Sequence, residues 1–273
     1  MNILLLGNGF DVAHGLPTRY QDFLVFLSNY RSFLEGKAYD PIYKDFFNNY
    51  FEDKYKRELN SCVVDNKLID YFLRIYEDRV AAGKVGWIDF ENEISSIIQA
   101  FDAADDYCTA LFDEGYSEAV LEFKEWKYLG LLLFGETDFE KSSFYRLTND
   151  SISKYISSLE DNLNKLIRAL ELYLSCFVAF IVDSDYRKEL DHCDFTKMNI
   201  SFLINFNYTN TYNYLYRNDN NHVSQCHVHG FAVQEHISDN ANMVLGINEY
   251  LNNDRKDSDN KFYMFKKFYQ RIM

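Results

Sequence analysis

The sequence is poor in basic residues. Its 273 residues include 28 Lys and Arg against 42 Asp and Glu, which gives a formal net charge of -14 at pH 7. Proteins that bind nucleic acid through the phosphate backbone depend on clustered cationic side chains. The charge balance therefore argues against general nucleic-acid binding and makes a nuclease toxin the weakest functional hypothesis. A local pocket for a single nucleotide stays compatible with it.

Cysteines are also few, and no two of them form a Cys-x-x-Cys pair. The chain has 5 cysteines, an odd number, scattered along the sequence. This pattern favours reduced thiols and a cytoplasmic protein. The longest apolar stretch, residues 172–182, is too short to span a bilayer. The N-terminus has no basic segment before a long apolar one, so we expect neither a signal peptide nor a membrane segment.

Proline is nearly absent, with 2 residues, both before position 42. Nothing therefore interrupts the helical spacing of apolar residues that dominates residues 39–194. Strand-like runs occur at 3–6, 199–209, 222–230 and 243–247. The economical fold is α/β: a Rossmann-like parallel sheet in a nucleotide-binding core, residues 1–38 and 195–273, with a large, mostly helical insertion at 39–194.

The first strand runs into the segment GNGFDVAHG, residues 7–15. The apolar run before it is typical of a strand buried on both faces. A Gly-x-Gly loop after such a strand lets backbone N–H groups approach a phosphate at the start of the next helix, for which Thr18 and Gln21 form a predicted capping pair. Tight-turn glycines are the structural alternative. However, Asn8, Asp11 and His14 are polar residues that a plain turn does not need, so we expect them to face a small polar ligand.

Two later segments offer side chains for chemistry. Asn207 follows a strand, where its amide can both donate to and accept from a ribose hydroxyl or a water; alternatively, Asn207 or Asn210 caps the next helix. His229 is a candidate general base because its ordinary pKa lies near neutrality, and a structural histidine is the alternative. His227 shares its strand face with His229, but no carboxylate cluster accompanies the pair, so no metal is expected.

Taken together, these segments resemble the phage abortive-infection proteins of the AbiH type. The resemblance rests, in chain order, on GNGFDVAHGLPTRYQDF, WIDFE, FNYTNT, HVHG and LGIN, which reach both ends of the chain. The same order is more distantly similar to sirtuin-like domains, in which a glycine loop holds the phosphates of NAD, an Asn contacts the ribose and a His is the base. That similarity implies phosphate-loop positions for Gly7, Gly9 and Phe10, a loop end at Gly15, Leu16 and Pro17, a ribose contact for Asn207 and the base role for His229.

The resemblance implies an anti-phage defence protein with NAD as its ligand or substrate. One hypothesis is an effector that hydrolyses the glycosidic bond of NAD. The alternative is a non-catalytic nucleotide sensor, or a defence subunit that binds a protein partner or a second copy of itself. Relatives continue past a segment like residues 262–273 into a further strand that would complete the crevice. The resemblance therefore implies an incomplete crevice here, which favours the alternative.

Overall fold

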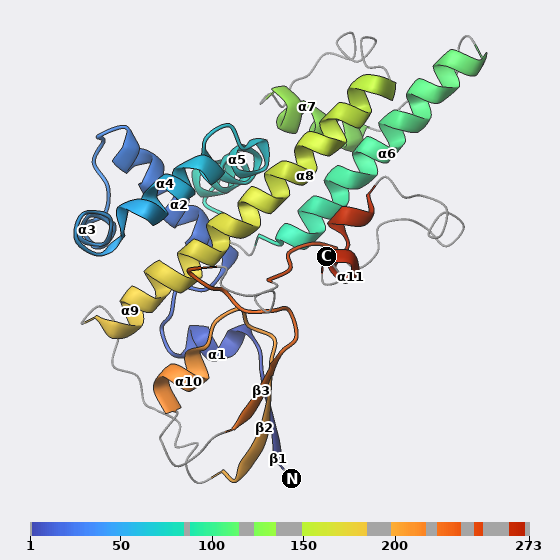
Figure 1. Cartoon of the computed structure of the whole chain (residues 1–273). Coiled ribbons are helices and arrows are strands. Elements are labelled where there is room, and N and C mark those ends of the chain that lie inside the picture. The colour runs from blue at the N-terminus through green and yellow to red at the C-terminus, as the bar shows by residue number, and fades with distance from the viewer. Residues whose placement is uncertain are drawn as a thin grey trace. The chain divides into compact units, whose positions relative to one another are not determined.

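The computed structural model describes residues 2–84, 88–114, 123–134, 149–184, 198–216, 223–235, 243–247 and 262–270. These residues form a mixed α/β fold that is mostly helical and contains a small parallel sheet (Figure 1). The chain divides into two compact units, the first made of Met1–Ser61 and Ile167–Val244 and the second of Cys62–Leu166 and Leu245–Met273. None of the described helices combines the length and the apolar character needed to cross a membrane. The domain boundaries expected near residues 38 and 194 stay a prediction.

The sheet belongs to the first unit. Its three strands, all parallel, lie side by side in chain order: β1 (Asn2–Leu6), β2 (Ile200–Asn205) and β3 (Ser224–His227). The register pairs Leu6 with Asn205 and Asn205 with His227, so the three strands end at the same edge. The segments that follow these strand ends therefore meet at one place, as the sequence predicted for the first three strand-like runs.

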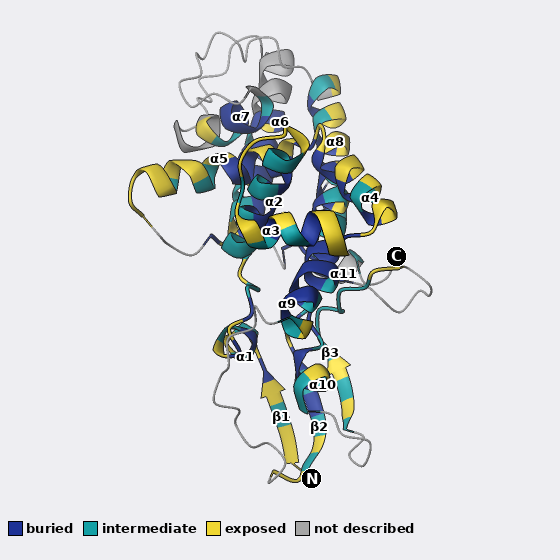
Figure 2. Ribbon diagram, turned by 90° about the vertical axis from the view of Figure 1, so that its left-hand side faces the viewer, coloured by how far each residue is buried: buried dark blue, intermediate teal, exposed yellow. Residues whose placement is uncertain are grey.

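One face of this sheet is buried and the other is exposed. Because side chains alternate along a strand, Leu4 and Leu6 face one way and Ile3 and Leu5 the other. Leu6 packs with Leu203 of β2 in a small apolar core, whereas Ile3 and Leu5 are 51% and 63% exposed (Figure 2). The expectation that the first strand is buried on both faces is wrong, since in the described chain only one face of it is covered.

The remaining elements of the first unit are helical. They are α1 (Asn8–Ala13), α2 (Tyr20–Leu34), α3 (Pro41–Asp45), the π-helical turn η1 (Phe46–Tyr50), α4 (Asp53–Val63), the end of α8 (Asn149–Leu172), the π-helical turn η3 (Tyr173–Val178), α9 (Ala179–Asp183) and α10 (Thr211–Tyr216). Helices α1 and α10 pack on the sheet, and α2, η1 and η3 meet in an aromatic core. Phe26 of α2 lies 4.9 to 5.5 Å, between ring centroids, from Phe47, Tyr173 and Phe177. Much of the high aromatic content therefore serves this core.

The second unit contains α5 (Lys67–Ala81), α6 (Phe90–Glu114), α7 (Phe123–Phe134), most of α8, the 3-10 turn η5 (Tyr263–Phe265) and α11 (Lys267–Gln270). The expectation of a strand at 243–247 is wrong: within the described chain this segment forms only an isolated bridge between Ile247 and Lys266. Ile247 N donates to the carbonyl of Phe265 at 2.9 Å. A Cβ on Gly246 would collide with that carbonyl, so glycine is required there for the close backbone approach.

Candidate functional site

The glycine-rich segment folds as a short helix rather than as an open loop. α1 begins directly after β1, with Gly7 in an extended conformation as its N-cap and Gly9 in its first turn. Phe10 N donates to the carbonyl of Gly7 at 2.8 Å, which closes that turn. The predicted loop conformation is therefore wrong over residues 8–13, because the chain turns into the helix within one residue of the strand end.

Neither glycine of the Gly-x-Gly pair is required by its backbone or its neighbours. Gly7 and Gly9 do not have positive φ, whereas Gly15 has φ 68 and makes the turn after α1. A Cβ added to Gly7 or Gly9 would meet no atom within 4 Å. Because no atom of the described chain requires glycine at these positions, the remaining physical reason for glycine is the close approach of a ligand.

Asp11 joins α1 to the loop after β2. Its side chain is 1% exposed, and its Oδ2 accepts a hydrogen bond of 2.5 Å from the hydroxyl of Thr209. The Thr211 hydroxyl donates to Thr209 at 3.1 Å. The other carboxylate oxygen, Oδ1, is buried without a hydrogen-bond partner. Burial raises the pKa of Asp11, while the threonine hydroxyls and His14 act in the opposite direction.

Asn207 ties the end of β2 to the end of β1. Its Nδ2 donates to the carbonyl of Gly7 at 3.0 Å, and its backbone N donates to Asn205 Oδ1 at 2.9 Å. Asn205 in turn donates through Nδ2 to the carbonyl of Thr209 at 3.0 Å. Among the described residues no group donates to Asn207 Oδ1, which leaves this oxygen able to accept. Asn207 does not cap α10, since that helix begins at Thr211, directly after Asn210.

His227, the last residue of β3, lies at the same edge of the sheet as Asn207. Its Nδ1 donates to the carbonyl of Asn207 at 3.1 Å, so its Nε2 accepts from the amide of Gln225. Burial lowers the pKa of His227, which keeps the ring neutral at pH 7. This histidine therefore fixes the backbone of Asn207. The sequence offered His227 only as half of a metal pair, because its partner is 20 residues away and no local pattern reveals it.

His229 follows in the turn after β3 and is half-buried. Its ring centroid lies 6.1 Å from that of Phe206 and 6.4 Å from that of Tyr208, the two residues that flank Asn207. The His229 carbonyl accepts a hydrogen bond of 3.1 Å from Val244 N. Gly7, Asn207 and His229 are thus brought to one edge of the sheet, as the sequence predicted; their roles there stay predictions.

The rings of His14 and Phe10 pack against Tyr216 of α10. Figure 1 shows the two helices α1 and α10 near the strand ends. The ring centroids of His14 and Phe10 lie 4.4 Å apart, and His14 Nδ1 donates to the carbonyl of Phe10 at 2.7 Å. His14 Nε2 forms a hydrogen bond of 2.5 Å with the hydroxyl of Tyr216. With 7% of His14 exposed, these contacts give the residue a structural function that holds α1 to α10.

Asn8 and Pro17 take part in the turn between α1 and α2. Asn8 Oδ1 accepts a hydrogen bond of 3.0 Å from the Thr18 hydroxyl, and the Pro17 carbonyl accepts one from Tyr173. The predicted capping pair Thr18 and Gln21 is therefore wrong. The Thr18 hydroxyl is engaged with Asn8, and α2 instead begins at Tyr20, with Asp22 Oδ2 accepting from Arg19 N at 2.9 Å.

The described residues contain no group of three or more His, Cys, Asp or Glu side chains that could hold a metal ion.

The sequence did not reveal Thr209 as the partner of Asp11, although Thr209 stands in the same FNYTNT segment as Asn207. Its position four residues after the end of β2 was the available signal.

A family model described as Bacteriophage abortive infection AbiH matches residues 3–272. The chain belongs to the AbiH family. The match covers nearly the whole chain, so the resemblance in the ordered motifs is confirmed, and membership implies a role in phage abortive-infection defence. No curated protein and no solved structure matches the chain. The chemistry of this AbiH protein therefore has to be argued from its site.

Proposed function

We propose that this AbiH protein binds NAD at the edge of the sheet where β1, β2 and β3 end, and that it hydrolyses the bond between nicotinamide and ribose. The observation that carries the proposal is the convergence of three segments. Asn207 Nδ2 donates to the Gly7 carbonyl at 3.0 Å, and the His229 ring lies against the residues on either side of Asn207. Ligands of parallel α/β sheets bind at this edge.

We place the diphosphate of the substrate in the open space beside Gly7 and Gly9. No atom lies within 4 Å of the position that a Cβ would take at either glycine. The first N–H groups of a helix have no acceptor inside the helix, and in this proposal those of Asn8 and Gly9 donate to the phosphates, since Phe10 N already donates to the Gly7 carbonyl. A side chain at Gly9 would fill the volume that the phosphates need.

In this proposal Asn207 binds the ribose and His229 is the general base. Asn207 Oδ1 can accept a hydrogen bond from a ribose hydroxyl, while Nδ2 stays on the Gly7 carbonyl. His229 acts as general base and takes a proton from a water molecule, whose oxygen bonds to C1′ of the ribose as the bond from C1′ to the nicotinamide nitrogen breaks. The products are nicotinamide, ADP-ribose and one proton. The sirtuin-like, Rossmann-type interpretation of the fold belongs to this proposal.

A second function, binding of the nucleotide without turnover, is favoured by the contacts of the motif side chains. Asn8 and His14, which the sequence suggested as ligand contacts, are engaged by Thr18, Phe10 and Tyr216. They stabilise α1 and add no reactive group to the edge. A site with few free polar groups suits a sensor that recognises a nucleotide and signals to a partner.

Purified protein incubated with NAD tests the two functions. We expect nicotinamide release, detected by chromatography. His229→Ala should abolish this release while calorimetry still detects NAD binding. Asn207→Ala should weaken binding itself, and Asn48→Ala, an exposed asparagine of η1, is the matched control. Binding of NAD by the parent protein without nicotinamide release would select the sensor, and absence of NAD binding would refute both functions.

A further inference from the structure

Tyr208 follows Asn207 in the FNYTNT motif and has no chemical role in the function proposed above. Its backbone carbonyl accepts a hydrogen bond of 2.8 Å from Ala232 N, and its hydroxyl donates to the Val244 carbonyl at 2.8 Å. Both partners lie in the chain that leaves β3 through His229. One residue of the loop after β2 therefore contacts the chain after β3 at two separate places, and all of these residues belong to the first unit.

Val244 connects the Tyr208 hydroxyl to His229. Val244 N donates to the His229 carbonyl at 3.1 Å, while the Val244 carbonyl accepts from Tyr208. Val244 is 1% exposed, so water has little access to the backbone groups of this residue. A buried backbone group without its partner costs free energy, which favours keeping both hydrogen bonds formed. The Tyr208 hydroxyl thus fixes the backbone of His229 through one intervening residue.

The ring of Tyr208 also lies beside the His229 imidazole. The two ring centroids are 6.4 Å apart, and the centroid of the Phe206 ring lies 6.1 Å from that of the imidazole. These separations are within the range of about 4.5 to 7 Å over which packed aromatic rings interact. His229 is half-buried, so the residue stays accessible to water. Phe206 and Tyr208 therefore restrict the orientations of the imidazole without enclosing it.

His229 stands where the chain leaves the sheet. Val228 N donates to the Asn205 carbonyl at 2.8 Å and so continues the pairing of β3 with β2. Gly230, on the other side of His229, has φ 75, in the left-handed region that glycine adopts easily. A glycine restrains its neighbours less than other residues do. The position of the imidazole therefore depends on contacts from outside the turn, and those of Tyr208 are of this kind.

We propose that Tyr208 is a positioning residue that orients the His229 imidazole, through its hydroxyl on Val244 and through its ring. This role rests on the hydrolysis of NAD proposed above, in which His229 takes a proton from water. A general base has to reach that proton within about 2.6 to 3.2 Å, so a small displacement of the ring slows the reaction. In this assignment Tyr208 itself touches no reacting atom. Its loss should therefore lower kcat and leave KM for NAD nearly unchanged.

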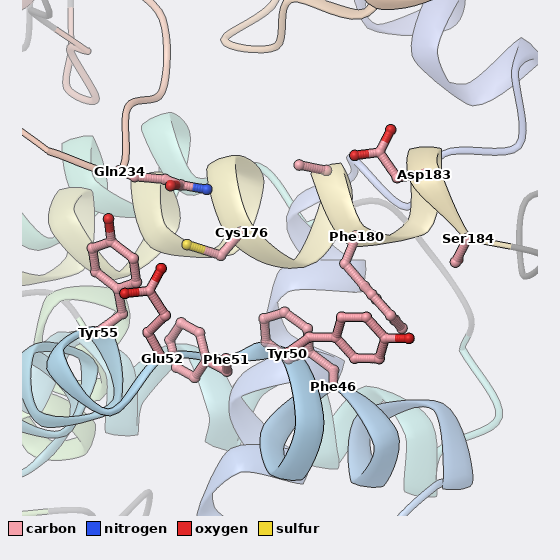
Figure 3. Close-up of a pocket in the computed structure, with 11 residues that line it drawn as sticks. Phe46, Tyr50, Phe51, Glu52, Tyr55, Cys176, Phe180, Asp183, Ser184 and Gln234 are labelled. Carbon is pink, nitrogen blue, oxygen red and sulfur yellow. The ribbon is translucent and has the colours of Figure 1, made fainter.

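Arg168 of α8 fastens the same chain farther from His229 and offers a matched control. Its guanidinium donates to the carbonyls of residues 233 and 234 at 3.0 and 2.6 Å. Gln234 lies beside the helix that η3 and α9 form (Figure 3). Weakening the contacts of Arg168 loosens this segment but leaves the hydrogen bonds of Tyr208 in place.

Steady-state hydrolysis of NAD, followed by nicotinamide release, tests the assignment. Tyr208→Phe keeps the ring and removes the hydroxyl, so kcat should fall about threefold to tenfold while KM stays within about twofold. Tyr208→Leu removes the ring as well and should lower kcat further. Arg168→Lys, and Tyr50→Phe at an exposed tyrosine of η1, should keep kcat within about twofold of the parent value. Parent-like kcat in both Tyr208 variants, or an equal loss in Arg168→Lys, would overturn the assignment.

NMR of the ligand-free protein tests the orientation of His229 without depending on turnover. Relaxation of the imidazole carbons should show a more mobile His229 ring in Tyr208→Phe than in the parent, and the Val244 amide should exchange faster. Arg168→Lys should show neither change. An equally ordered His229 ring in Tyr208→Phe would refute the assignment even if the parent hydrolyses NAD. A parent that releases no nicotinamide would refute the hydrolysis, and the ring mobility would then decide separately whether Tyr208 orients His229.

Discussion

Two motif glycines, Gly9 and Gly246, are expected to respond in opposite ways to the same substitution. At Gly246 an added Cβ would overlap the Phe265 carbonyl oxygen and lie 3.2 Å from its carbon, so the backbone has to move. Overpacking of this kind destabilises by about 1 to 3 kcal/mol. The movement also breaks the hydrogen bonds that Ile247 makes to Phe265 and Lys267, at 2.9 and 3.0 Å, each contributing about 1 kcal/mol. Gly246→Ala should therefore lower the free energy of unfolding by about 3 to 5 kcal/mol.

At Gly9 the same methyl group meets nothing within 4 Å and falls in the helix α1. Alanine is a better helix former than glycine by about 1 kcal/mol, so Gly9→Ala should leave stability unchanged or slightly raised. If a nucleotide approaches Gly9, this variant should nevertheless lose NAD binding and phage protection.

Urea denaturation followed by circular dichroism, together with a phage plating assay, measures both effects. A Gly246→Ala protein as stable as the parent would refute the close backbone approach. A Gly9→Ala protein that protects cells as well as the parent would show that the open space at Gly9 holds no ligand.

Three further substitutions test individual parts of the first unit. Burial raises the folded-state pKa of Asp11, so the parent protein should lose stability as the pH rises above about 4. In urea denaturation Asp11→Asn should be more stable than the parent at pH 7, and the difference should fade at acidic pH. Burial lowers the pKa of His227, so the parent should lose stability as the pH falls below 6.5, and thermal melting of His227→Gln should show a weaker acid dependence. The Arg168 guanidinium donates to Glu58, Glu171 and the carbonyls of residues 233 and 234, a set of hydrogen bonds that a lysine cannot reproduce. Arg168→Lys should therefore lower the free energy of unfolding by about 1 to 3 kcal/mol. Amide exchange in residues 233–235 should become faster.

The longer helices could be predicted because their apolar residues repeat at helical spacing. Phe23, Phe26, Leu27 and Tyr30 form such a stripe, and all four are buried in α2. The π-helical turns could not be predicted in this way, because one extra residue in a turn leaves the surrounding periodicity almost intact. The segment 243–247 has the composition of a strand, yet the close approach at Gly246 allows only one bridge.

The place of the candidate site was predictable, and its internal contacts were not. Asn207 and His229 follow strand ends, and strand ends of a parallel sheet meet at one edge. α1 was missed because a six-residue helix containing glycine is unstable by itself. It is held by the contacts of Asp11 with Thr209 and of His14 with Tyr216, whose partners lie 198 and 202 residues away in the sequence.

Hydrogen exchange of the protein with and without NAD tests most directly whether the strand ends form the nucleotide site. We expect slower amide exchange in residues 7–13 and 205–209 when NAD is bound, and loss of this protection in Gly9→Ala. Unchanged exchange in both segments at saturating NAD, or protection confined to other parts of the chain, would contradict a nucleotide site at the strand ends.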